Sequence, residues 1–121
     1  MERRRTVLVV DDQPHIRMLM TAVLTTRDLD VICAPDGRQA LELVKARRPG
    51  VVLLDWVMPG MGGEEFLLRL QEVDPYVPVL LITGSAEGPD TSRHPRVSDF
   101  LAKPFDVWEL ASRVERLLSS R

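Results

Sequence analysis

Three aspartates stand where two apolar runs of the sequence stop. Asp11 and Asp12 directly follow Val7–Val10, and Asp55 directly follows Val51–Leu54. In an open parallel sheet, ligands bind beyond the carboxyl ends of the strands, where the strand order reverses. Clustered carboxylates repel one another unless a cation or a proton intervenes. Mg²⁺ takes oxygen ligands and keeps waters that a phosphate can replace, so the spacing predicts a divalent-cation site if the two runs are neighbouring strands.

Two more polar residues follow apolar runs in the second half of the chain. Thr83 comes after Val79–Ile82, and Lys103 comes after Phe100–Ala102. A lysine supplies a compact positive charge suited to a phosphoryl oxygen, and Lys103 is one of only two lysines in a chain that otherwise uses arginine. The charges of three carboxylates, this lysine and one divalent cation cancel. The set therefore predicts a site that is neutral before a phosphate arrives.

These residues are separated by segments that alternate between strand and helix patterns. Continuous Val/Ile/Leu runs are typical of parallel strands covered on both faces, and alternation with helices predicts an α/β domain with right-handed crossovers. The predicted strands are Val7–Val10, Val31–Ala34, Val51–Leu54, Val79–Ile82 and, more weakly, Phe100–Ala102. Helices are predicted from Pro14, from Asp36-Gly37 to Pro49-Gly50, over Phe66–Val73, and from Asp106, with a capping box to Glu109, to about Leu118.

One connection breaks this alternation. The segment Glu87–Arg96 has no large apolar residue and contains two prolines. A helix there would have no face to bury, and proline limits it to one or two turns. We expect this crossover to be a short or disordered fourth helix.

Composition bounds the protein class. The chain has 121 residues, 45% hydrophobic and 28% charged, with a net charge of −2, which fits one globular domain over residues 1–121. A near-neutral charge argues against direct nucleic-acid binding, and no apolar run approaches the ~20 residues that cross a bilayer. Cys33 is the single cysteine and fits a reducing, cytoplasmic location.

Taken together, these motifs resemble the receiver domain of two-component response regulators over essentially the whole chain. The matching segments are Asp11-Asp12, Asp55, Met58–Gly63, Thr83-Gly84 and Lys103-Pro104-Phe105. The resemblance implies a flavodoxin-like, doubly wound five-stranded parallel sheet of order 2-1-3-4-5. It also implies a signalling switch rather than a turnover enzyme, phosphorylated by a sensor histidine kinase or a histidine phosphotransfer protein.

The resemblance also assigns the acidic residues their roles. Asp55 is expected to be the phosphoacceptor, which becomes an aspartyl-phosphate. Asp12 and Asp55, with the backbone carbonyl of Val57, are expected to bind Mg²⁺ or Mn²⁺ directly, and Asp11 mostly through water.

The remaining roles concern the phosphoryl group and the response to it. Lys103 and Thr83 are expected to contact the phosphoryl oxygens, and Gly84 leaves access to them. Phe100 occupies the place of the family's switch aromatic, which would turn inward as Thr83 moves, although an ordinary core residue explains it nearly as well. The output surface would lie around the fourth helix, the fifth strand and the last helix.

Partner contacts are the least specified part of the prediction. Met18 and Ala22 lie off the apolar stripe of the first predicted helix, where they would dock a kinase's histidine-bearing helix or be scattered surface residues. The stripe of the last predicted helix leaves Trp108 on nearly the opposite side. We expect Trp108 to make a partner contact or a homodimer contact on phosphorylation; the alternative is a ring folded over a neighbouring loop.

Two other classes of phosphate-binding protein rank behind the receiver domain. A haloacid-dehalogenase-type phosphatase also uses an aspartate nucleophile, but after the first strand and in an Asp-x-Asp arrangement. A flavodoxin-like flavin carrier needs a Ser/Thr/Gly-rich phosphate loop where this chain has Asp11-Asp12. Multiple turnover on a phosphate ester would favour the phosphatase, and a single stoichiometric phosphorylation would favour the switch.

Overall fold

The computed structural model describes residues 5–58, 60–84 and 95–119, which form five strands and four helices. All strand pairs are parallel, and the sheet order is β2-β1-β3-β4-β5, which confirms the predicted fold class. The elements in chain order are β1 (Thr6–Val10), α1 (Pro14–Thr25), β2 (Asp30–Ala34), α2 (Gly37–Arg47), β3 (Val51–Asp55), α3 (Gly63–Val73), β4 (Val79–Thr83), β5 (Val97–Ala102) and α4 (Val107–Ser119).

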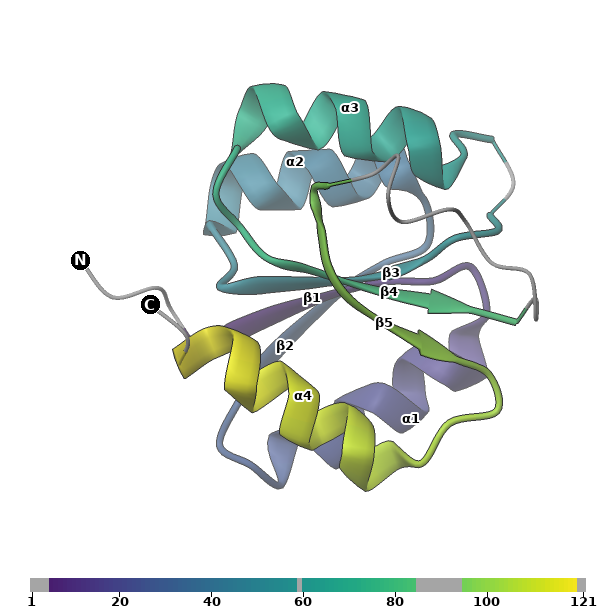
Figure 1. Cartoon of the computed structure of the whole chain (residues 1–121), viewed down its shortest axis with the longest axis vertical. Helices are drawn as coiled ribbons and strands as arrows, with labels where there is room; N and C mark the ends of the chain where they lie inside the picture. The colour runs from purple at the N-terminus through teal and green to yellow at the C-terminus, as the bar shows by residue number, and fades with distance from the viewer. Residues whose placement is uncertain (1–4, 59, 85–94, 120–121) are drawn as a thin grey trace.

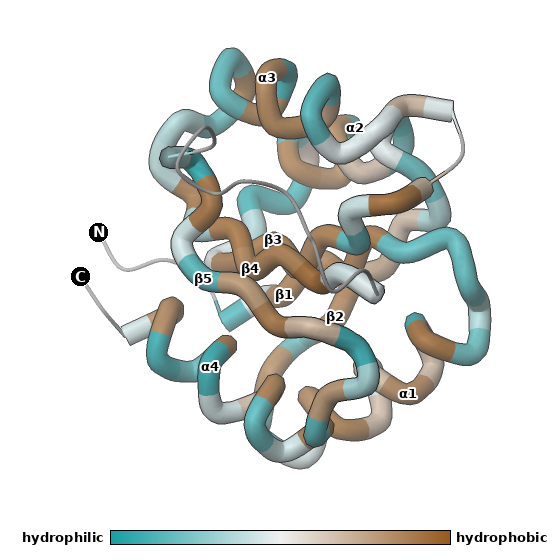
Figure 2. The backbone as a smooth tube through the Cα atoms, turned by 45° about the vertical axis from the view of Figure 1, so that its right-hand side comes forward, coloured by the Kyte–Doolittle hydropathy of each residue, from teal (hydrophilic) through white to brown (hydrophobic). Residues whose placement is uncertain are grey.

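Helices cover both faces of the sheet (Figure 1). The pair α2 and α3 lies on one face, and the pair α1 and α4 lies on the other. Successive residues of β1 point to opposite faces: Leu8 and Val10 pack in the core under α2 and α3, whereas Val7 and Val9 pack in the core under α1 and α4. This double burial explains why the central strands carry unbroken apolar runs between their polar end residues, and these runs are brown in the hydropathy colouring of Figure 2.

Local sequence signals set the helix ends. Asp36 caps α2 by accepting a hydrogen bond from the Gln39 amide at 2.8 Å. Asp106 does the same for α4, accepting from the Glu109 amide at 3.1 Å. Only this hydrogen bond of the predicted capping box is formed. The Glu109 carboxylate pairs with Arg113, at 2.8 Å, and not with the Asp106 backbone.

Every strand extends beyond its predicted bounds, and β1 and β2 each begin one residue earlier, at Thr6 and Asp30. Asp55 and Thr83 are the last residues of β3 and β4 rather than the first residues after them. Strand β5 begins at Val97, three residues before the predicted start at Phe100. As an edge strand, β5 alternates partly buried and exposed residues, so only its end reads as an apolar run. The predicted short fourth helix over Glu87–Arg96 lies almost wholly outside the described residues.

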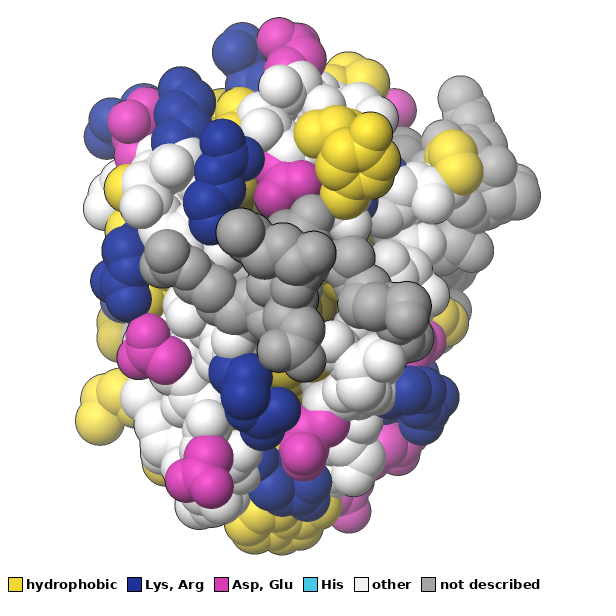
Figure 3. Space-filling model, turned by 90° about the vertical axis from the view of Figure 1, so that its left-hand side faces the viewer, with side chains coloured by type: hydrophobic (Ala, Val, Ile, Leu, Met, Phe, Trp, Pro, Cys, Tyr) yellow, Lys and Arg dark blue, Asp and Glu magenta, His cyan; other side chains and the backbone are white. Residues whose placement is uncertain are grey.

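One face of the molecule carries side chains of mixed charge. Figure 3 shows the face that bears the amino ends of the strands, where the basic and acidic side chains of the described residues are interspersed. Within the ranges that the structure describes, none of the helices has the length and apolarity to cross a membrane.

Candidate functional site

The parallel register brings the three aspartates to one edge of the sheet. Val10 of β1 pairs with Leu54 of β3, so Asp11 and Asp55 leave neighbouring strands at the same level. One carboxylate oxygen from each of Asp11, Asp12 and Asp55 lies within 4.8 Å of the other two. Asp11 and Asp55 are only 1% and 7% exposed. Most of their negative charge is therefore shielded from bulk water.

Lys103 lies against both buried carboxylates. Its Nζ atom is 3.7 Å from Asp11 Oδ2 and 3.8 Å from Asp55 Oδ2. The backbone of Lys103 is held at the end of β4, because its N–H donates to the Thr83 carbonyl at 2.7 Å. One cation facing three carboxylates leaves the site with excess negative charge, and Asp11 Oδ2 is buried without a hydrogen-bond partner. The donor set, and this oxygen that accepts no hydrogen bond from the described residues, fit a hard divalent cation.

Two residues that were not predicted from the sequence fix the loop between β1 and α1 at Asp11. The Gln13 backbone N–H donates to Asp11 Oδ1 at 2.9 Å, and Arg17 Nη1 donates to the Asp11 backbone carbonyl at 2.7 Å. Gln13 directly follows the acidic pair and could have been found from that position. Arg17 carried no signal, because its role depends on the first turn of α1 facing back toward the end of β1.

A cavity of about 280 Å³ opens over the phosphoacceptor candidate. The described residues that line it are Asp12, Gln13, Asp55, Val57, Gly84 and Lys103. Asp11 and Thr83 are not among these lining residues and are buried from solvent. The cavity therefore exposes one nearly buried carboxylate, that of Asp55, beside a lysine ammonium and a second acid.

The Asp55 carboxylate holds its proton more tightly than an ordinary aspartate. Burial raises its pKa above the usual 3.8, and the charge of Asp11 raises it further. The Lys103 ammonium and the Val57 backbone N–H, which lies 3.4 Å from Asp55 Oδ1, lower the pKa in part. Asp12 contributes a smaller increase. A positive charge arriving in the cavity would relieve this repulsion.

We expect Asp55→Asn to raise the free energy of unfolding at neutral pH without divalent metal. Because the folded-state pKa of Asp55 is raised, the folded protein binds the proton more strongly than the unfolded chain. Stability from that proton is present at low pH and is lost as pH rises from 3.8 through the folded pKa. Asparagine removes the buried charge, so its advantage should vanish in acid. Urea unfolding against pH measures this, with Asp30→Asn as the control, because Asp30 lies in an exposed pair with Arg47.

The predicted switch aromatic and the three predicted partner residues are all exposed. Phe100 on β5 is 44% exposed and Trp108 at the start of α4 is 52% exposed. Met18 and Ala22 are exposed on α1. Trp108 also has the Arg27 guanidinium over its ring, 5.7 Å from the centroid, so one ring face is covered by the turn that follows α1.

Comparisons with known proteins agree with this arrangement. The family model of the response regulator receiver domain matches residues 7–115. The chain is 36% identical over 114 residues to the sporulation initiation phosphotransferase F of Bacillus subtilis, covering 93% of this chain and 92% of that protein. It is 36% identical to the DNA-binding response regulator MtrA of Mycolicibacterium smegmatis over 95% of this chain, but spans only 51% of that protein.

A solved structure gives the same result. The response regulator TrrA of Thermotoga maritima, in complex with Mg²⁺-BeF, superimposes with a TM-score of 0.84 at 26% identity, covering 97% of this chain and 99% of that one. The matched family model spans most of the chain and includes Asp11, Asp55 and Lys103. The chain therefore belongs to the family of response regulator receiver domains, the phosphorylation switches of two-component signalling.

Proposed function

We propose that Asp55 accepts a phosphoryl group from the phosphohistidine of a sensor histidine kinase or a histidine phosphotransfer protein. The observation that carries this proposal is the Asp55 carboxylate at the cavity, with the Lys103 ammonium 3.8 Å away. A carboxylate oxygen of Asp55 attacks phosphorus, the P–N bond breaks, and its electron pair returns to the imidazole. The protein contributes position and charge neutralisation, which dominate phosphoryl transfer.

Asp11, Asp12, Asp55 and the Val57 backbone carbonyl would hold Mg²⁺ or Mn²⁺. Support comes from the mutual proximity of the three carboxylates and from the buried Asp11 Oδ2, which has no hydrogen-bond partner among the described residues. The bound cation would neutralise charge on the phosphoryl oxygens. Gln13 and Arg17 hold the Asp11 loop in place for this ligand set.

Lys103 and Thr83 would then link the bound phosphoryl group to a conformational change at the surface. Lys103 would exchange Asp55 for a phosphoryl oxygen, and the Thr83 hydroxyl would bind another. The backbone hydrogen bond from Lys103 to Thr83 couples the ends of β4 and β5. Phe100 lies on β5 opposite Leu81 of β4, so a shift of Thr83 at the end of β4 can change the packing around the Phe100 ring.

Contacts with other proteins would use the exposed residues described above. Met18 and Ala22 on α1 would meet the histidine-bearing helix of the phosphodonor. Trp108 would contact a partner or a second phosphorylated copy through the exposed part of its side chain. We propose that this domain does not contact nucleic acid directly.

The proposal is tested by incubating the protein with acetyl phosphate and Mg²⁺ and measuring its intact mass. We expect the wild type to gain the mass of one phosphoryl group and Asp55→Ala to gain none. Chelation of divalent metal should prevent the gain. An unchanged gain in Asp55→Ala would show another acceptor, and release of many phosphates per protein from a phosphate ester would favour a phosphatase instead.

A further inference from the structure

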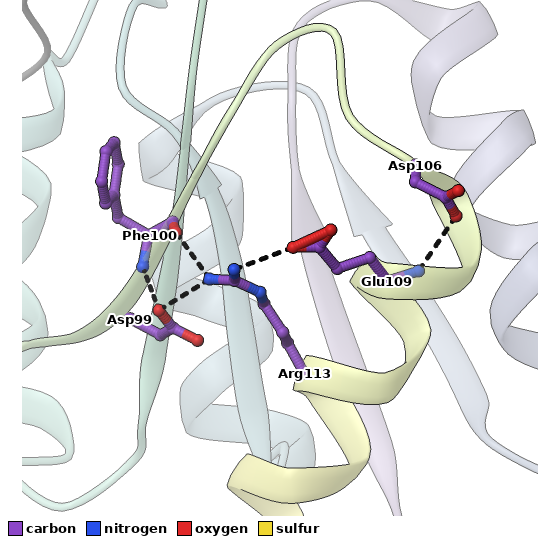
Figure 4. Close-up of polar contacts among 5 residues, drawn as sticks. All are labelled: Asp99, Phe100, Asp106, Glu109 and Arg113. Atoms are coloured by element: carbon purple, nitrogen blue, oxygen red, sulfur yellow. Dashed lines mark hydrogen bonds and ion pairs between the residues drawn. The ribbon is translucent and has the colours of Figure 1, made fainter.

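A polar cluster joins the edge strand to the last helix (Figure 4). Arg113 of α4 points toward β5, where its Nη1 atom lies 3.0 Å from Asp99 Oδ1 and 2.9 Å from the Phe100 carbonyl oxygen. Its Nη2 atom lies 2.8 Å from Glu109 Oε1, one turn earlier on α4. We call Arg113, Asp99 and Glu109, with the Phe100 backbone, the β5–α4 latch.

The β5–α4 latch holds both backbone groups of Phe100. The Phe100 N–H donates to Asp99 Oδ1 at 2.8 Å, and the same oxygen accepts from Arg113. Because β5 is the edge strand, backbone groups on its open side have no neighbouring strand. The register with β4 is also irregular where β5 begins, between Val79 and Leu80. Side chains of the latch therefore replace a strand partner at Phe100.

The Arg113 contacts are chemically stronger than an ordinary surface pair. Arg113 and Asp99 side chains are 25% and 28% exposed, and hydrogen bonds to charged groups exceed neutral ones in strength. A guanidinium presents its donors in a rigid fork, which here binds strand and helix together. The latch thus fixes the backbone at Phe100 while the ring stays 44% exposed.

We infer that Arg113 is a positioning residue that holds β5 in the arrangement with the Phe100 ring outward, and that phosphorylation must loosen this latch. The inference rests on the proposed phosphorylation of Asp55. Contacts made in one of two conformations shift the equilibrium toward that conformation. Arg113 would therefore increase the free energy that phosphorylation must supply to move β5.

The test measures the affinity of Mg²⁺-BeF, a phosphoryl mimic, by calorimetric titration of wild type and Arg113→Ala. Loss of a net-stabilising hydrogen-bonded contact should tighten binding by roughly two- to tenfold. The matched control is Arg69→Ala, which removes an i,i+4 pair with Glu65 that lies within α3. A merely destabilised domain would bind the mimic more weakly, so tighter binding distinguishes the latch from a structural role.

Arg113→Lys separates charge from geometry. It keeps the positive charge but lacks the fork that reaches Asp99, Phe100 and Glu109 together, so most of the tightening should remain. Affinity in Arg113→Ala that equals Arg69→Ala, or falls below the wild type, would overturn the latch, as would full wild-type affinity in Arg113→Lys. If the wild type itself does not bind Mg²⁺-BeF, the proposed phosphorylation of Asp55 fails instead.

Discussion

Lys103→Met should slow the phosphorylation of Asp55 by acetyl phosphate by roughly a hundredfold or more, the scale seen when one preorganised transition-state donor is removed. The Lys103 ammonium is within 4 Å of the two buried carboxylates, and methionine keeps a similar length without the charge. Two effects add. The ammonium would no longer meet the transferring phosphoryl oxygens, and the pKa of Asp55, which Lys103 lowers, would rise further.

Lys45→Met is the matched control, because Lys45 is the other lysine of the chain. It lies on α2 in an exposed pair with Glu42, 3.7 Å apart, and exposed pairs contribute little. Its phosphorylation rate should equal that of the wild type, measured by intact mass against time. If Lys103→Met also kept the wild-type rate, Lys103 would have no part in the transfer.

The central strands of the sheet were predictable because strands buried on both faces have apolar sequences. Strands β1, β3 and β4 are covered on both faces, so they read as unbroken apolar runs. Strand β5 lies at the edge and alternates, and its first three residues escaped detection. The convergence of Asp11 and Asp55 was also predictable, because parallel topology requires strand ends to meet at one edge.

Contacts that depend on side-chain direction across elements were not predictable. Arg17 holds the Asp11 backbone and Arg113 holds the Phe100 backbone, yet both read in sequence as ordinary polar positions on amphipathic helices. The exposure of Trp108 followed from helical periodicity, but its contact with Arg27 did not. Periodicity states which face a residue occupies, and a specific partner on another element is decided only by three-dimensional packing.

Gly63→Ala should lower the free energy of unfolding by about 1–3 kcal/mol, the usual penalty for overpacking. A Cβ at Gly63, the first residue of α3, would lie 2.8 Å from Trp56 Cζ3 and 2.9 Å from Cδ2. The indole is rigid and packs against the core under α2 and α3, so it must move as a whole. Because Trp56 directly follows Asp55, the displacement should also weaken Mg²⁺ binding at the carboxylates.

Helix propensity predicts the opposite sign, since alanine is favoured over glycine within helices by up to about 1 kcal/mol. Urea unfolding therefore decides between the two effects. Gly62→Ala is the comparison variant: its Cβ would meet no heavy atom of the described residues within 4 Å. Because Gly62 is the N-cap of α3, its loss of stability measures only the N-cap preference for glycine over alanine, about 1 kcal/mol, and a larger loss in Gly63→Ala measures the clash with Trp56. Trp56→Leu should remove the Gly63→Ala penalty in a double-mutant cycle. A Gly63→Ala protein as stable as the wild type would show that the indole yields freely, and that the Trp56 ring does not fix the backbone beside Asp55.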